Sequence, residues 1–166
     1  MLRMEENQSL SKGPGTYILV MRLEREATVT VGRLGTIAFE AGYYFYVGSA
    51  LGGLRSRLGH HLRKEKRHHW HIDYLLDQAH IVEIWFTQGK ERVECNWAEA
   101  MRAQEGVKPA HKGFGASDCH CATHLFFATQ QTAPASTRKR LGKKRPVQRW
   151  QPSEHGQWTN NIPNER

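Results

Sequence analysis

Short apolar runs separated by turn residues recur along most of the chain. Residues 27–31 alternate between polar and apolar side chains, and the turn sequence Gly32-Arg33-Leu34-Gly35 divides them from residues 36–39, which predicts an extra strand or hairpin. Longer runs have the aliphatic, aromatic and β-branched composition of strands. They cover residues 16–23, 42–50, 81–87 and 123–129.

Helical spacing of apolar residues marks further segments. Leu54, Leu58 and Leu62 recur every four residues and predict a helix with one buried stripe. Similar patterns predict a second helix that ends at Asp77 and a third over residues 92–104. We therefore expect an α+β fold with a small, mainly antiparallel, three-stranded core sheet, extra hairpin strands and flanking helices.

The strand over residues 42–50 leads into a group of side chains that suits phosphate chemistry. It carries Tyr46-Val47-Gly48, and the helix after it places Arg57 and His61 together beside the leucine stripe. Gly15-Thr16-Tyr17 opens the first strand and supplies a second phenol. A phosphodiester gathers negative charge in its transition state, which a planar arginine can bind while a phenol or an imidazole moves protons.

The order of these residues resembles the GIY-YIG nuclease superfamily, whose two name motifs stand here as Gly15-Thr16-Tyr17 and Tyr46-Val47-Gly48. Residues 70–76, the Glu94-Cys95 pair and residues 117–125 are similar to its Uri-type branch, the domain of unknown function 123. The resemblance covers residues 14–128. Thr16 replaces the usual apolar middle residue, and the long gap between the two motifs would hold the extra hairpin.

The resemblance implies a metal-dependent endonuclease that hydrolyses phosphodiester bonds in DNA with water as the nucleophile. By the same resemblance, Tyr17 is the general base, and Tyr46 and His61 orient water or share the proton relay. Arg57 would stabilise the transition state. A free phenol has a pKa near 10, so nearby positive charge must help Tyr17 to lose its proton.

Two acidic residues and a further histidine extend this set. The histidines at residues 68–71 either form a metal site or, by the resemblance, supply a second histidine at the scissile phosphate. For that role we favour His71 over His68 and His69, because Trp70 and the apolar residues after it fix its position. Glu94 is implied as the single carboxylate that holds one Mg²⁺ or Mn²⁺. The alternative for Glu94 is an acid that stabilises a helix amino terminus. Asp73 either orients a histidine or serves as such a first-turn acid.

The chain is basic, and its charges are unevenly placed. The 24 lysines and arginines outnumber the 16 aspartates and glutamates and give a formal net charge of +8. Near the first helix, several cations surround only one acid, Glu65, which favours an anionic partner over a self-paired surface. We expect this patch to bind nucleic acid through Arg55, Arg63, Lys64, Lys66 and Arg67.

The sequence divides into a flexible segment over residues 1–13, one folded domain over residues 14–128 and a tail. From residue 129 onward, eight lysines and arginines stand against two glutamates in a polar segment without periodicity. We expect residues 129–166 to form a basic, disordered tail. Its clusters at residues 138–140 and 143–145 either contact nucleic acid or lie in a solvated extension.

The cysteines leave several interpretations open. Cys95, Cys119 and Cys121, with His124 close behind, could close a tetrahedral zinc site. A C-x-C pair is narrower than the usual ligand spacing, so reduced, buried cysteines are favoured over structural zinc, and a disulfide between Cys95 and Cys119 is favoured less than either.

Function classes are bounded by what the chain lacks. No apolar run approaches the roughly 20 residues of a membrane helix, and the charged amino terminus has no signal-peptide core. We expect a soluble, cytoplasmic protein without membrane contact or an organic small-molecule cofactor. The competing function is a catalytically weak or inactive nucleic-acid-binding module on the same fold, and a protein-interaction domain ranks last.

Overall fold

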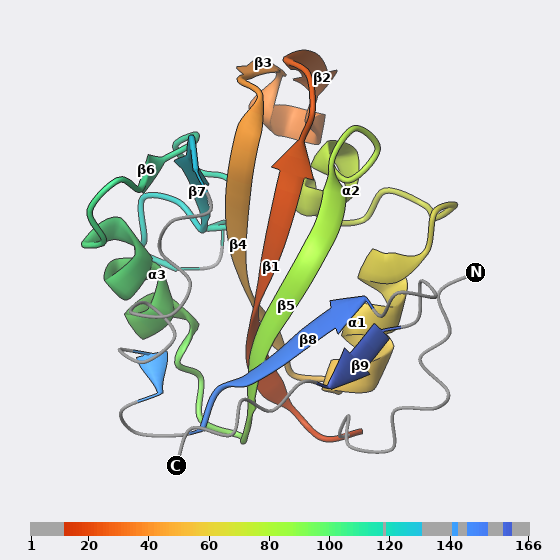
Figure 1. The fold of residues 1–166 in the computed structure, drawn as a ribbon, viewed down its shortest axis with the longest axis vertical. Helices are drawn as coiled ribbons and strands as arrows, with labels where there is room; N and C mark the ends of the chain where they lie inside the picture. Colours follow the sequence, from red (N-terminus) through yellow and green to blue (C-terminus); the bar gives the residue numbers. More distant parts are fainter. Residues whose placement is uncertain (1–11, 118, 131–140, 143–145, 153–157, 161–166) are drawn as a thin grey trace.

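The computed structural model describes residues 12–117, 119–130, 141–142, 146–152 and 158–160 (Figure 1). The helices are α1 (Leu54–Leu62), α2 (His71–Leu75) and α3 (Glu94–Arg102), with a 3-10 turn at Gly32–Leu34. The strands are β1 (Gly15–Leu23), β2 (Ala27–Thr30), β3 (Thr36–Phe39), β4 (Gly42–Ala50), β5 (His80–Gln88), β6 (Lys108–Pro109), β7 (Leu125–Ala128), β8 (Gln148–Pro152) and β9 (Trp158–Asn160). Among the helices of these described ranges, none is long and apolar enough to cross a membrane.

One antiparallel sheet organises the molecule. Its strand order is β6-β7-β4-β1-β5-β8-β9, and every pair of neighbours runs antiparallel. The predicted α+β class and the antiparallel sheet are confirmed. The predicted three-stranded core was too small, because short strands extend both sides of the central group β4-β1-β5 to a seven-stranded sheet.

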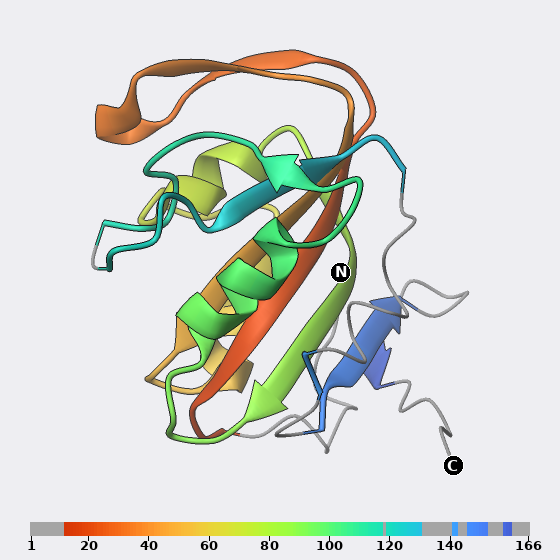
Figure 2. The ribbon, with the colours of Figure 1, turned by 90° about the vertical axis from the view of Figure 1, so that its left-hand side faces the viewer.

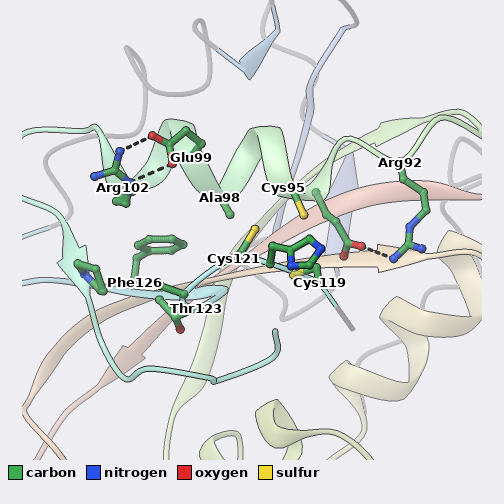
Figure 3. A pocket seen from close by; sticks show the side chains of 13 residues that line it. Arg92, Cys95, Ala98, Glu99, Arg102, Cys119, Cys121, Thr123 and Phe126 are labelled. Atoms are coloured by element: carbon green, nitrogen blue, oxygen red, sulfur yellow. Dashed lines mark hydrogen bonds and ion pairs between the residues drawn. The ribbon is translucent and has the colours of Figure 1, made fainter. Parts of the chain in front are cut away.

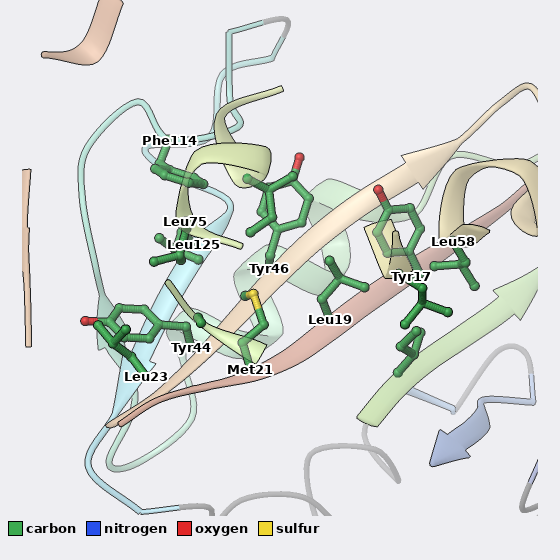
Figure 4. Close-up of a cluster of buried hydrophobic side chains, with 14 of the residues drawn as sticks. Tyr17, Leu19, Met21, Leu23, Tyr44, Tyr46, Leu58, Leu75, Phe114 and Leu125 are labelled. Atoms are coloured by element: carbon green, nitrogen blue, oxygen red, sulfur yellow. The ribbon is translucent and has the colours of Figure 1, made fainter. Parts of the chain in front are cut away.

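Both faces of the central strand β1 are buried. Tyr17, Leu19 and Met21 face the apolar cluster packed by α1 and α2, part of which is drawn in Figure 4. Ile18 and Val20 face the opposite cluster, packed by α3. Figure 2 shows α3 on the near side of the sheet and α1 and α2 on its far side. A strand covered on both faces reads as a continuous apolar run, which explains the pattern of β1.

The hairpin predicted between the two tyrosine motifs is present. β2 pairs with β3 from Ala27 opposite Phe39 to Thr30 opposite Thr36, as a second two-stranded sheet. Its turn closes at Gly35, whose φ of 81° lies in the left-handed region that favours glycine. The hairpin bends over one end of the main sheet (Figure 2). The extra residues therefore leave β1 and β4 as direct neighbours.

The expectation of a disordered tail over residues 129–166 is wrong for residues 148–152. They form β8, which pairs with β5, and Trp150 is fully buried and packs against Phe86. Arg149 and Gln151 project to the other face and donate hydrogen bonds to the buried carboxylate of Glu83. This strand alternates only over five residues, so its periodicity does not stand out. The basic clusters at 138–140 and 143–145, and residues 1–11 of the predicted flexible segment, lie outside the described residues.

Candidate functional site

A cavity lies where the sheet leaves one edge of β4 uncovered. Pairing between β4 and β7 ends at Tyr46 and Leu125, and Val47 donates one further backbone bond to His124. Within the described residues, no strand lies beside residues 48–50 on that side. Groups from both faces of the sheet meet there around a cavity of about 340 Å³. Its walls include Tyr46, Gly48, Arg57, Trp70, His71 and Glu94.

The two predicted tyrosines lie together at this edge. Tyr17 is opposite Gly48 and Leu19 is opposite Tyr46, so both phenols project from the same face as diagonal neighbours, with ring centroids 6.4 Å apart (Figure 4). Tyr46 lines the cavity, whereas Tyr17 is 1% exposed. A Cβ at Gly48 would overlap the Tyr17 ring. Glycine there lets the Tyr17 hydroxyl lie directly behind the cavity wall.

Tyr17 is hydrogen-bonded to the predicted histidine of α1. Its hydroxyl lies 2.7 Å from His61 Nε2. Burial raises the pKa of Tyr17 above its ordinary value and lowers the pKa of His61 to about 3. The phenol is therefore protonated and donates to a neutral imidazole, which carries its own hydrogen on Nδ1. That nitrogen lies 4.0 Å from Oδ1 of Asp73.

Asp73 both contacts a histidine and lies in the first turn of a helix, the two roles that the sequence left open for it. It is fully buried in the first turn of α2 and accepts hydrogen bonds from the backbone N–H groups of His69 and Trp70. His60 Nε2 lies 3.1 Å from the same carboxylate. Burial opposes ionisation of Asp73, but these hydrogen bonds outweigh it and lower its pKa. A buried anion therefore stands behind both histidines of α1.

The Arg57 guanidinium is held from two directions. It lies 4.0 Å above the centre of the Trp70 ring and donates a hydrogen bond of 3.1 Å to the backbone oxygen of Ser49. The oxygen belongs to the uncovered part of β4, so the uncovered edge leaves an acceptor for the side chain. Stacking and hydrogen bonding fix the plane of the guanidinium, which lets it face an anion in the cavity.

His71 reaches the cavity, as the sequence predicted. The backbone N–H of Gly115 donates to His71 Nδ1 at 2.9 Å, so the neutral ring carries its hydrogen on Nε2. Burial lowers the pKa of His71 and favours this neutral form. His69 also lines the cavity, whereas His68 stacks on Tyr74 and pairs with Asp77 at 2.6 Å.

Glu94 begins α3 and faces the same cavity as Arg57. Only 7% of it is exposed, and its Oε1 lies 2.5 Å from Nη2 of Arg92, a pair marked in Figure 3. The Arg92 side chain is 48% exposed, so this ion pair borders solvent. Glu94 also stands in the first turn of its helix, so the electrostatic role at the amino terminus is met as well.

The predicted basic patch divides into two kinds of side chain. Arg63, Lys64 and Arg67 are exposed on the segment that follows α1. Lys66 instead donates to the carbonyl oxygens of His61 and Arg63, at 2.7 and 3.1 Å, and burial lowers its pKa. Lys66 therefore satisfies the carboxyl end of α1. Arg55 is partly buried near the start of the helix.

The three cysteines and His124 gather beside Glu94. Their ligand atoms all lie within 4.8 Å of one another, and Cys119 Sγ lies 3.4 Å from His124 Nε2. All three cysteines are free, so the disulfide interpretation is wrong. Burial raises the pKa of Cys95, and it raises the pKa of Cys121 to about 12. The thiols line a second cavity of about 680 Å³ (Figure 3). Together with His124 they form a cluster that could hold a metal ion.

A comparison with known protein families gave a match that covers most of the chain. A family model described as domain of unknown function DUF123 matches residues 16–146. The chain belongs to the DUF123 family. This confirms the part of the predicted resemblance that named this domain, and the DUF123 match extends beyond the boundary expected at residue 128. Neither the curated proteins nor the solved structures gave a match.

Some contributors to the DUF123 site were not singled out from the sequence. His60 stands three residues after Arg57, and that helical spacing could have placed it near the site. Trp70 was expected to fix His71, but not to stack under Arg57. Arg92 precedes its partner Glu94 by two residues in a loop, where no periodicity marks an ion pair.

Proposed function

We propose that this DUF123 domain is a GIY-YIG-type, Uri-like endonuclease that hydrolyses phosphodiester bonds of DNA with the help of a divalent metal ion. The observation that carries the proposal is the cavity itself. It gathers Tyr46, Arg57, His71 and Glu94 from separate segments of the chain, and the hydrogen-bonded pair of Tyr17 and His61 lies directly behind its wall. A phenol, a fixed guanidinium, an imidazole and a carboxylate are the groups that such a reaction needs.

Arg57 and His71 would bind the phosphate. The Arg57 guanidinium is held flat against Trp70, so little side-chain freedom is lost when its N–H groups donate to phosphate oxygens. His71 presents its Nε2–H, because its other nitrogen accepts the backbone N–H of Gly115. These donors are in place before substrate binds, which is the condition for strong stabilisation of charge that develops in the transition state.

Tyr17 would act as the general base through His61. As the phenol takes the proton of the attacking water, its own proton passes to His61 Nε2 across the 2.7 Å hydrogen bond. The Asp73 carboxylate, 4.0 Å from Nδ1, partly offsets the cost of the imidazolium that forms, because burial lowers the pKa of His61 more than this anion raises it. No buried phenolate has to persist, so this relay permits catalysis although burial raises the pKa of Tyr17. Tyr46 would hold the water at the cavity wall.

Glu94 fits one Mg²⁺ or Mn²⁺. Its carboxylate is nearly buried, faces a cavity with room for phosphate oxygens and water, and already attracts a cationic group, the half-exposed Arg92 guanidinium. When bound, the ion supplies positive charge to the phosphate and to the leaving 3′ oxygen. Arg92 would turn toward solvent and give up its hydrogen bond to the carboxylate.

Cleavage of DNA by matched carboxylate variants tests the proposal. Glu94 and Glu99 both lie on α3 and both pair with an arginine. We expect Mg²⁺- or Mn²⁺-dependent cutting that chelator abolishes, a loss of roughly a hundredfold or more in Glu94→Gln, and wild-type rates in Glu99→Gln. Arg57→Lys keeps the charge but loses the stacked plane, and should lose a similar factor. Cutting that persists in Glu94→Gln and Arg57→Lys, with unchanged melting, would overturn the assignment.

A binding module without catalysis is the second candidate. Two observations favour it: Glu94 is already paired with Arg92, and burial keeps both tyrosines protonated by raising their pKa values. This candidate predicts that single- and double-stranded DNA bind with a clear salt dependence, while neither Mg²⁺ nor Mn²⁺ produces cut products.

A further inference from the structure

The cluster of three cysteines and one histidine has the dimensions of a tetrahedral metal site. Sulfur atoms at about 2.3 Å from a tetrahedral ion lie roughly 3.8 Å apart, and a sulfur and a nitrogen lie roughly 3.6 Å apart. The four ligand atoms here lie within 4.8 Å of one another, and the Cys119 Sγ to His124 Nε2 distance is 3.4 Å. A contraction on the order of an ångström would complete the coordination shell.

We propose that Cys95, Cys119, Cys121 and His124 bind one Zn²⁺ as a structural site. Three soft thiolates and one imidazole form a ligand set that selects zinc among the common divalent ions and leaves no open coordination position for substrate. The sulfurs of Cys95 and Cys121 point toward one another in Figure 3, with Cys119 beside them, from α3 on one side and the loop before β7 on the other. The neighbouring cavity of about 680 Å³ provides a path by which the ion enters.

One ligand is already fixed by the backbone. His124 is 1% exposed, its carbonyl oxygen accepts from Val47 of β4, and its N–H donates to Phe114. The cysteines come from less constrained positions, at the second residue of α3 and in the loop over residues 119–121. A metal ion would therefore tie the start of α3 and this loop to the end of β4 through an anchored imidazole.

The position of the proposed zinc site next to Glu94 suggests what the site does. Cys95 follows Glu94 directly, so an ion bound by Cys95 fixes the helix turn from which the Glu94 carboxylate reaches the catalytic cavity. The thiols are positioning residues, because they do not line the cavity that holds Tyr46 and Arg57. This consequence for Glu94 rests on the proposed nuclease function, whereas zinc binding itself does not.

Metal content of the purified full chain, prepared without a histidine tag, tests the site. We expect one zinc per chain in the wild type, and tetrahedral cobalt bands with thiolate-to-cobalt charge transfer after exchange with Co²⁺. His124→Ala should lose both signals. His120→Ala is the matched control, because His120 lies in the same loop beside the cavity but outside the ligand set, and it should keep them. Wild-type protein that neither contains zinc nor gives these cobalt bands would overturn the proposal.

The positioning role is tested with two substitutions at one ligand. Cys121→Ala should lose zinc and raise the Mg²⁺ concentration for half-maximal cutting by roughly tenfold or more, whereas Cys121→His should retain zinc and an Mg²⁺ requirement near that of the wild type. Zinc binding without any cutting in the wild type would support the site and contradict the nuclease. Cutting with an unchanged Mg²⁺ requirement in zinc-free Cys121→Ala would overturn the positioning role while the nuclease stands.

Discussion

Burial sets the protonation states of both His61 and Tyr17. The imidazole is neutral because desolvation lowers its pKa to about 3, despite the opposing charge of Asp73. A neutral ring can accept the Tyr17 proton across their hydrogen bond, which an imidazolium could not do. The sequence predicted the residue types and their helix face. The direction of the hydrogen bond depended on the depth of burial, which residue spacing does not contain.

The same residue predicts a pH dependence of stability. Between pH about 3 and 6.5, the unfolded chain binds a proton at His61 that the folded chain does not. The free energy of unfolding should therefore fall as pH drops below 6.5, by up to about 1.4 kcal/mol per pH unit from this group. Asp73 acts in the same direction at lower pH, because its pKa is also lowered. The titratable and charged groups around His61 include Tyr17, Tyr46, Arg57, His60, Lys66 and Asp73.

Urea unfolding from neutral pH to mildly acidic pH checks this expectation. His61→Gln should flatten the decline, whereas His80→Gln, which changes an exposed histidine, should keep the wild-type slope. Identical slopes in the wild type and His61→Gln would show that His61 does not remain neutral in the folded protein.

Among the elements, β8 shows how tertiary contacts can order a polar segment. Trp150 fills the apolar cluster on one face of β5, and Arg149 and Gln151 satisfy the buried Glu83 on the other. The long strands and helices were predictable, because each repeats its buried positions over several turns or pleats. β8 has too few residues for such a repeat. It is held by pairing with the edge of β5 and by hydrogen bonds from Arg149 and Gln151 to Oε2 of Glu83, whose Oε1 accepts from Trp85.

Truncation of the chain before β8 tests how much this strand contributes to stability. A chain that ends at Gln130 should be less stable by several kcal/mol than a chain that ends at Pro152, because removal of β8 leaves the charge of Glu83 buried and unpaired and exposes its apolar neighbours. Urea unfolding of the two chains measures the difference. Equal stability would mean that β8 contributes nothing to the fold. A DNA-binding test of the tail should therefore use the longer chain as its reference.

In the whole molecule, a group of exposed cations lies next to the candidate active site. The chain carries a formal net charge of +8, and the exposed cations Arg63, Lys64 and Arg67 lie on the segment that leads from α1 to His69 and Trp70 at the cavity. A polyanion on this segment would pass the candidate active site. The sequence predicted the patch from its lack of acids, but it grouped Lys66 with the others because sequence does not show hydrogen-bond partners.

The salt dependence of DNA binding distinguishes these lysines and arginines. Replacement of Arg63, Lys64 and Arg67 by alanine should reduce the slope of log affinity against log salt by roughly one unit for each phosphate that the variant no longer neutralises. Lys66→Ala should keep the slope but lower the melting temperature, because its ammonium donates to the end of α1. Fluorescence anisotropy without divalent ions separates binding from cutting. A slope unchanged in the triple variant would place the DNA path elsewhere.

The sequence by itself determined the α+β class, the long strands and helices, the hairpin between the tyrosine motifs, and the residue types of the candidate site. The elements follow from local periodicity, which records the buried face of each one, whereas the site residues came from their chemistry and from the resemblance of the two tyrosine motifs. Only the tertiary structure decided that β8 completes the sheet, that Arg92 pairs with Glu94, that Trp70 stacks under Arg57, and that the cysteines converge on His124. Contacts between distant segments depend on strand order and on edges left uncovered, and no local pattern of residues encodes either.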